Sequence, residues 1–258
     1  MAFSGTRAFL RSDGLKIGTA IFEFDTPGIG HILRAGGVEF AFLDMEHSGL
    51  GMDAMKRLMR YCEAAGLQIL VRPPSKATHH VCRVLDMGAG GVILPMVGSA
   101  EEARSIAQSM KYVPDGNRGV ALGIAHDRYA PGPVADKLAE ANRSTAMIAL
   151  IETTDGVRNA AEIAAVPEVD VLWIGHFDLS CSLGIPGQFD HPRFQQAVAD
   201  VIDAAKHHGK ALGRLTASVD EGADLAAQGF DVICYSGDIW LLQSALAGAV
   251  AALRKATS

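Results

Sequence analysis

The chain has 258 residues, of which 49% are hydrophobic and 20% charged, and its 23 Lys and Arg against 29 Asp and Glu give a net charge of −6. The composition is that of a globular protein. No basic block is longer than a pair, so the sequence offers no electrostatic attraction to nucleic acid or to anionic lipid. Because α/β barrels use about 250 residues as one domain, we expect a single domain over residues 1–258.

The first fourteen residues lack the apolar core of a signal peptide, and no uncharged apolar run reaches the roughly 18 residues of a membrane helix. We therefore expect a cytoplasmic protein without membrane contact. The cysteines form no C-x-x-C pair, which argues against a zinc knuckle or a redox couple. We expect four reduced, buried and inert thiols, at Cys62, Cys82, Cys181 and Cys234.

Short apolar runs alternate along the chain with longer segments of helical periodicity, the pattern of βα units on a parallel sheet. The runs predict strands over Lys16–Phe22, Phe40–Asp44, Gln68–Arg72, Gly91–Pro95, Ala146–Glu152, Val171–Gly175, Ala211–Leu215 and Asp231–Ser236. The periodic segments predict helices over Pro27–Ala35, Met52–Ala65, His79–Met87, Ala100–Met110, Gly156–Ala164, His191–His208, Val219–Gln228 and Ile239–Arg254. Eight strands and eight helices indicate a closed (β/α)8 TIM barrel.

Two connections are longer than simple turns, Lys111–Arg143 and His176–Asp190. Barrels place functional insertions at the mouth formed by the carboxyl ends of the strands. On that basis His126, Arg128 and Tyr129 of the first connection are candidates for lining a substrate pocket.

Ionisable residues stand at or just after the ends of four predicted strands, where barrel chemistry is located. They are Asp44, Glu46 and His47 after the second strand, Arg72 in the third, Glu152 in the fifth, and His176 and Asp178 after the sixth. Each also has a structural alternative, such as a turn cap for Asp44 or Asp178 and a buried histidine for His47. Their coincidence at one mouth favours function.

Glu152 and Asp178 are oxygen ligands with no cysteine or H-x-x-x-H motif nearby, so a metal between them should be a hard divalent ion, best Mg²⁺, with Mn²⁺ or Co²⁺ as alternatives. Such a sparse site suits a bidentate 2-oxo acid, whose enolate a Lewis acid stabilises. Arg72, followed by Pro73 and Pro74, would place a planar cation beside the developing oxyanion.

His47 is the predicted base, because a histidine both takes up and returns a proton near neutral pH. Asp44 and Glu46 would orient it or the waters of the metal. Asp86 would raise the basicity of His47, but it lies at the wrong end of its own barrel and would act only on a neighbouring subunit. A Schiff-base lysine is the competing mechanism, and only Lys76 stands close to a strand end suited to it.

Several motifs resemble the HpcH/HpaI aldolases, which are metal-dependent class II pyruvate aldolases. They are FLDMEH at 42–47, VRP at 71–73, ILPMV at 93–97, IET at 151–153 and IGxxDLS at 174–180. The resemblance implies a (β/α)8 barrel, commonly in a hexamer, whose last helix packs on a partner subunit. It also implies His47 as base, Arg72 as enolate-stabilising cation, Glu152 and Asp178 as metal ligands, and Asp86 as the residue that tunes the histidine.

The chain departs from this pattern at three residues expected to contact substrate. Leu150 stands where such aldolases have Gln, which removes a hydrogen-bond donor, and His176 and Phe177 replace Pro and Ala in the turn that binds the pyruvate carboxylate. Arg214, near the end of the seventh strand, is a candidate either for a distal anion of the acceptor or for an inter-subunit salt bridge.

The sequence therefore predicts an aldolase that cleaves a 4-hydroxy-2-oxo acid into pyruvate, or hydroxypyruvate, and an aldehyde. Two alternatives remain. One is a citryl/malyl-CoA-type lyase, which uses the same enolate chemistry on a thioester. The other is a non-catalytic barrel that binds a 2-oxo acid and a metal.

Overall fold

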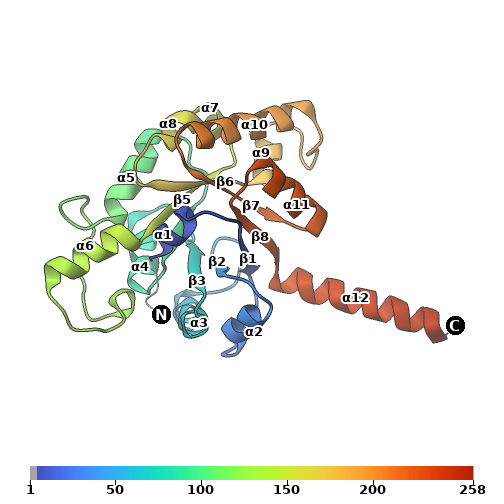
Figure 1. Ribbon diagram of the computed structural model, residues 1–258, viewed down its shortest axis with the longest axis horizontal. Helices are drawn as coiled ribbons and strands as arrows, with labels where there is room; N and C mark the ends of the chain where they lie inside the picture. Colours follow the sequence, from blue (N-terminus) through green and yellow to red (C-terminus); the bar gives the residue numbers. More distant parts are fainter. Residues whose placement is uncertain (1–4, 258) are drawn as a thin grey trace.

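The computed structural model describes residues 5–257 and shows a closed barrel of eight parallel strands surrounded by helices (Figure 1). The strands are β1 (Lys16–Ile21), β2 (Phe40–Asp44), β3 (Gln68–Arg72), β4 (Gly91–Leu94), β5 (Ala146–Ile151), β6 (Val169–Ile174), β7 (Ala211–Thr216) and β8 (Val232–Gly237). Each pairs with the next in sequence, and β8 pairs back onto β1. The predicted (β/α)8 TIM barrel is confirmed, and every predicted strand is present to within two residues at each end.

The helices between the strands include all those predicted, with three additions. They are α1 (Thr6–Arg11), α2 (Ile29–Ala35), α3 (Met52–Ala64), α4 (Thr78–Asp86), α5 (Ala100–Met110), α6 (Val134–Ser144), α7 (Thr154–Arg158), α8 (Ala160–Ala164), α9 (His176–Ser182), α10 (Pro192–His207), α11 (Val219–Gln228) and α12 (Asp238–Thr257). The additions are α1, α6 and α9, and the helix predicted over Gly156–Ala164 is divided at Asn159.

Alternating residues of each strand divide the core into two layers, as the period of two requires. Phe42, Leu150 and Trp173 belong to the layer that fills the barrel, and Leu43 and Ile151 to the layer packed under the helices. A polar residue two positions beyond an inward apolar residue therefore points into the mouth. Phe42 and Leu150 predict this orientation for Asp44 and Glu152.

Helix α1 lies against the amino-terminal end of the barrel, where it contacts β5 and β6. Its Leu10 is buried within the inner layer. Arg7 and Arg11 each place Nε 2.8 Å from Oδ1 of Asp170, a fully buried carboxylate whose Oδ2 accepts the Met147 N–H. Asp170 thus holds the end of the barrel closed by pairing with two cations and one backbone donor.

Helix α12 leaves the barrel and projects into solvent (Figure 1). Its first residue, Asp238, is buried and accepts the N–H groups of Phe22, Glu23 and Phe24 at 2.8–3.0 Å, which ties the start of the helix to the loop after β1. Beyond it, large apolar side chains are exposed at Trp240, Leu241, Leu242, Leu246, Val250 and Leu253. No helix within residues 5–257 is long and apolar enough to cross a membrane.

Two predictions about connections and thiols need correction. The connection 111–143 lies at the amino-terminal end of the barrel, because it runs from the end of α5 to the start of β5. The predicted burial of the cysteines is wrong for Cys181, which is exposed, and only partly right for Cys82, which is half-buried. Cys181 is exposed because it lies on α9, a surface helix that the sequence reading did not predict.

Replacing Asp170 by Asn should destabilise the fold, because both arginines lose the negative charge that they contact. We expect a loss of about 2 kcal/mol in the free energy of unfolding measured with urea. The control is Asp155→Asn, which removes an exposed pair with Arg158 and should cost less than about 0.5 kcal/mol. Equal effects of the two substitutions would show that Asp170 is not an anchor.

Candidate active site

Arg72 is clamped at the mouth by two acidic side chains. Asp44 and Arg72 are register partners at the ends of β2 and β3. The guanidinium donates to both carboxylate oxygens of Asp44, at 2.8 and 2.6 Å, and lies 3.2 Å from Glu46. Burial opposes the charge, but Asp44 and Glu46 outweigh it and raise the pKa of Arg72. Asp44 therefore fixes Arg72 rather than His47, and the planar cation has a set direction.

Glu152 is held in a confined position at the mouth. It is buried, and its Oε1 accepts the Met96 N–H at 2.6 Å. A Cβ added to Gly175 would lie 2.3 Å from Oε2, so only glycine leaves room for this carboxylate. Burial, opposed by the Met96 N–H and Arg72 and aided by Asp178 and Glu46, raises the pKa of Glu152 to about 7.

These acids fit a divalent cation by the chemistry of their donors. Glu152 and Asp178 interact electrostatically, and their mutual repulsion is the kind that a bound cation relieves. Within residues 5–257 no cluster of three or more His, Cys, Asp and Glu side chains could hold a metal. A cation at Glu152 and Asp178 would therefore take its remaining ligands from water and substrate, as Mg²⁺ commonly does.

His47 lies on the loop after β2, on the same side of the barrel as Arg72. Its side chain is 60% exposed, and its Nε2 lies 3.9 Å from the carboxylate of Glu46. Glu46 thus contacts both His47 and Arg72. Burial raises the pKa of Glu46, and Arg72 and then His47 act against that shift. The structure brings Asp44, Glu46, His47, Arg72 and Glu152 to one mouth.

Asp86 is not part of this mouth. It is the last residue of α4, and its carboxylate lies 2.5 Å from Nη2 of Arg118, a buried arginine stacked on Tyr112. Both residues lie at the amino-terminal end of the barrel, opposite the mouth. Within one chain, Asp86 is paired with Arg118 and does not reach His47.

The three departures from the family pattern have different surroundings. Leu150 lies inside the barrel beside its register partner Trp173, two residues before Glu152, which directly follows β5. Phe177 is exposed, whereas the His176 ring packs against Phe177 and Phe189 with ring centroids 4.5 and 5.2 Å away. The apolar contacts of the His176 ring argue against a polar substrate contact through that ring.

Arg214 is not available for either role predicted from the sequence. It faces the outer helices, because its neighbour Gly213 points inward and touches Trp173. Its Nη2 lies 3.0 Å from Glu221 on α11, within the same chain, and its guanidinium lies 5.9 Å from the Phe194 ring. The predictions of a distal-anion contact and of an inter-subunit bridge are both wrong for this residue, since its charge is already paired internally.

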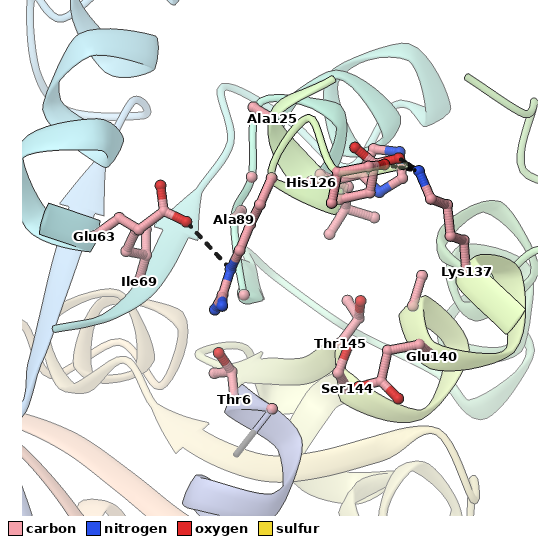
Figure 2. A pocket seen from close by; sticks show the side chains of 18 of the residues that line it. Thr6, Glu63, Ile69, Ala89, Ala125, His126, Lys137, Glu140, Ser144 and Thr145 are labelled. Carbon is pink, nitrogen blue, oxygen red and sulfur yellow. Dashed lines mark hydrogen bonds and ion pairs between the residues drawn. The ribbon is translucent and has the colours of Figure 1, made fainter. Parts of the chain in front are cut away.

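A cavity of about 480 Å³ lies at the opposite end of the barrel, not at the mouth (Figure 2). Its walls include residues that precede or begin strands, such as Gln68, Gly90 and Thr145, together with His126 and Arg128. Tyr129 is on the same exposed loop. The prediction that His126, Arg128 and Tyr129 line the substrate pocket of their own barrel is therefore wrong, because their connection joins the amino-terminal ends of its elements.

Two contributors to the mouth escaped the sequence reading. The Met96 backbone N–H binds Glu152, and a backbone donor leaves no signature in the residue type. Gly175 leaves the space for the Glu152 carboxylate, and here the signal was present, since a glycine directly before the predicted acidic turn indicates a close approach. Lys76, the one candidate for a Schiff base, is engaged with Glu102 and the Met96 carbonyl.

The stability of the protein should fall below neutral pH partly through His176. Burial and then Arg214, opposed by Glu221, lower the pKa of His176 to about 4, whereas an unfolded histidine titrates near 6.5. The contribution of neutral His176 to stability is therefore complete above about pH 6.5 and is lost as the pH falls towards 4.

Between pH 7 and pH 5, the wild type should lose on the order of 1 to 2 kcal/mol more unfolding free energy than His176→Gln. Urea denaturation at the two pH values measures this difference, with the exposed His31→Gln as control. Parallel losses in wild type and His176→Gln would contradict the assignment.

Comparison with known proteins identifies the family of the chain. The family model for HpcH/HpaI aldolase/citrate lyase matches residues 28–244. A hydroxypyruvate/pyruvate aldolase of Chromohalobacter salexigens is 32% identical, over 86% of this chain and 87% of its own. A 2-keto-3-deoxy-L-rhamnonate aldolase of Shigella sonnei is 29% identical, over 88% and 87%.

Among solved structures, an HpcH/HpaI aldolase from Desulfitobacterium hafniense superposes with a TM-score of 0.88 at 32% identity, covering 93% of both chains. The fold, the motifs and these relatives agree, and the family predicted from the sequence is confirmed. The chain is a carbon–carbon lyase that belongs to the HpcH/HpaI aldolase/citrate lyase family.

Proposed function

We propose that this protein, as one domain over residues 1–258, is a divalent-metal-dependent class II aldolase. It would reversibly cleave 4-hydroxy-2-oxo acids into pyruvate, or hydroxypyruvate, and an aldehyde. The observation that carries the proposal is the clamped Arg72 guanidinium beside the buried Glu152 carboxylate, at a mouth that also holds His47. The names of the relatives support this substrate class.

Glu152 and Asp178 would hold the cation, with Mg²⁺ favoured by the two-carboxylate donor set and Mn²⁺ or Co²⁺ as alternatives. When bound, a divalent ion supplies Lewis-acid stabilisation to the oxo group of the substrate. Because Glu152 is held against Gly175 and by Met96, its carboxylate needs little reorganisation to bind a cation. The cytoplasmic location expected from the sequence remains a prediction.

Side chains of this protein would accept the 4-hydroxyl proton and stabilise the enolate charge. In cleavage, His47 accepts the proton of the 4-hydroxyl group, the C3–C4 bond breaks, and its electron pair forms the pyruvate enolate while C4 becomes the aldehyde carbon. Arg72, which Asp44 orients, faces the enolate oxygen as negative charge develops there. Protonation at C3 then gives pyruvate. Asp86 can assist His47 only from another subunit.

Residues at the turn after β6 would contact the substrate. Backbone groups at His176 and Phe177 would bind the carboxylate of the 2-oxo acid, and the exposed Phe177 side chain would border the acceptor. Leu150 would present an apolar surface below it. Replacing a proline by His176 adds a backbone N–H to this turn.

The rival functions differ in what they require. A citryl/malyl-CoA-type lyase would depend on coenzyme A thioesters, and a non-catalytic binding barrel would show metal and oxo-acid binding without turnover. A sensor has no need of a buried Glu152 with a raised pKa beside a fixed arginine, and such an arrangement is costly to keep. The aldolase is therefore the proposal that uses every group at the mouth.

A pyruvate-release assay on 4-hydroxy-2-oxo acids of varied chain length tests the function. Protein stripped with a chelator should be inactive and should regain activity with Mg²⁺, Mn²⁺ or Co²⁺. Glu152→Gln and Asp178→Asn should abolish turnover at every metal concentration, and His47→Ala should lower kcat about 10²- to 10⁴-fold if it is the general base.

Borohydride treatment in the presence of pyruvate controls for a Schiff base and should leave activity unchanged. Inactivation by borohydride would overturn the metal mechanism. Turnover only with coenzyme A thioesters would identify the lyase, and metal binding without any turnover would identify the binding barrel.

We further propose that α12 joins subunits, in a homo-oligomer that the family resemblance predicts to be a hexamer. The support is the projecting helix itself, whose exposed Leu242, Leu246, Val250 and Leu253 make an apolar surface unusual for a monomer. A second copy of the chain would cover this surface.

Light scattering coupled to gel filtration should give six times the chain mass for the wild type. The double variant Leu246→Glu, Leu253→Glu should give smaller species, because two buried charges would oppose helix packing. Val219→Glu, a change at another exposed apolar residue, is the control and should leave the mass unchanged. A monomeric wild type would refute this proposal.

A further inference from the structure

We propose that Lys76 is a positioning residue that fixes the peptide after Met96 and, through the Met96 backbone, the metal-binding carboxylate of Glu152. The inference rests on the proposed function, since it assigns a role to the ligand set proposed above. It replaces the idea of Lys76 as a Schiff-base amine with a role in which the ammonium group never touches substrate.

A continuous series of contacts joins Lys76 to Glu152. The Lys76 ammonium donates to the Met96 carbonyl at 2.6 Å, and the backbone N–H of Met96 donates to Glu152 Oε1 at 2.6 Å. Lys76 itself is paired with Glu102 at 2.5 Å. The second oxygen of Glu102 accepts the Gly98 N–H at 2.9 Å. Lys76 and Glu102 therefore bind the loop after β4 at two backbone groups, the Met96 carbonyl and the Gly98 N–H.

The Met96 backbone needs such support. Its φ is +48°, in the left-handed region that a residue with a side chain rarely adopts. Conformations of this kind persist only where the surroundings determine them, and they cluster at functional sites. Here the unusual φ turns the Met96 N–H towards the mouth, where it meets the carboxylate. A relaxed Met96 would aim its N–H elsewhere.

Two further hydrogen bonds hold this loop. The Val97 N–H donates to the Leu150 carbonyl at 3.1 Å, and Asn159 Nδ2 donates to the Gly98 carbonyl at 2.7 Å. The Val97 N–H and the Met96 carbonyl belong to one peptide, so Leu150 and Lys76 hold that peptide from its two sides. The Met96 N–H belongs to the preceding peptide, and the φ of Met96 sets the angle between the two. Lys76 therefore acts on the Glu152 contact by holding one of the two peptides that this angle relates.

The protein contains a matched lysine at the other end of the barrel. Lys137 donates to the Ala130 carbonyl and lies 2.6 Å from Asp127, whose carboxylate also accepts the Gly123 N–H. The pattern of carboxylate, lysine, carbonyl and glycine amide is the same, but none of these groups contacts the mouth. Lys137→Met therefore reports the structural cost of losing such a lysine.

The experiment measures Mn²⁺ binding to chelator-stripped protein by electron paramagnetic resonance. Loss of an outer contact to a metal ligand usually weakens binding about 10- to 100-fold. Lys76→Met should raise the Mn²⁺ dissociation constant by about 10-fold or more on this basis, with Lys137→Met within about twofold of wild type. Lys76→Arg should largely restore the Mn²⁺ affinity, because a guanidinium can donate to both Glu102 and the Met96 carbonyl. An arginine could not replace a lysine that forms a Schiff base.

Amide hydrogen exchange of the metal-free proteins separates this inference from the proposed function. Exchange at Met96 and Gly98 should accelerate at least about 10-fold in Lys76→Met, if the contact closes the loop as the geometry indicates, and should not change in Lys137→Met. Unchanged exchange, or unchanged Mn²⁺ affinity in Lys76→Met, would overturn the positioning role. If the wild type binds no Mn²⁺ while exchange still accelerates in Lys76→Met, the proposed metal function is refuted, and with it the link between Lys76 and metal binding.

Discussion

The site depends on keeping a buried carboxylate, Glu152, in one place among other acids. Burial and the nearby Asp178 and Glu46 disfavour its charge, and the structure offsets this with the Met96 N–H and the Arg72 guanidinium. A side chain in that position has a raised affinity for a proton or for a cation. The barrel brings these groups together, because each partner of Glu152 comes from a different strand or loop.

Contacts at the mouth hold the side chains of the site in fixed positions. Asp44 holds Arg72 at Nε and Nη2, Gly175 leaves room for Glu152, and the left-handed Met96 directs its N–H. Below them Phe42, Leu150 and Trp173 fill the barrel with apolar side chains. At the far end Asp170 closes the barrel with α1, and at the mouth Asp238 directs α12 outwards. The proposed active site and the proposed assembly helix thus both follow the carboxyl ends of strands.

The sequence predicted the strands well, because apolar β-prone runs such as 40–44 and 68–72 have few other uses. It also placed Asp44, Arg72 and Glu152 at the mouth, since each lies two positions after an inward apolar residue. The prediction for Arg214 was wrong because Arg214 lies two positions after Leu212, which faces the outer helices. In β7 the residue that faces inward is Gly213. Helix α6 and the Met96 contact were missed for different reasons, the first because it lies inside a polar connection and the second because backbone donors are not written in the residue type.

The central claim is that this mouth makes and holds a pyruvate enolate with the help of a divalent ion. Exchange of the methyl protons of pyruvate for deuterium, followed by proton NMR in D₂O without any aldehyde, tests it without knowledge of the acceptor. The account predicts exchange with Mg²⁺, none after chelation, and none in Glu152→Gln. Exchange that persists without metal, or that survives in Glu152→Gln, would contradict it.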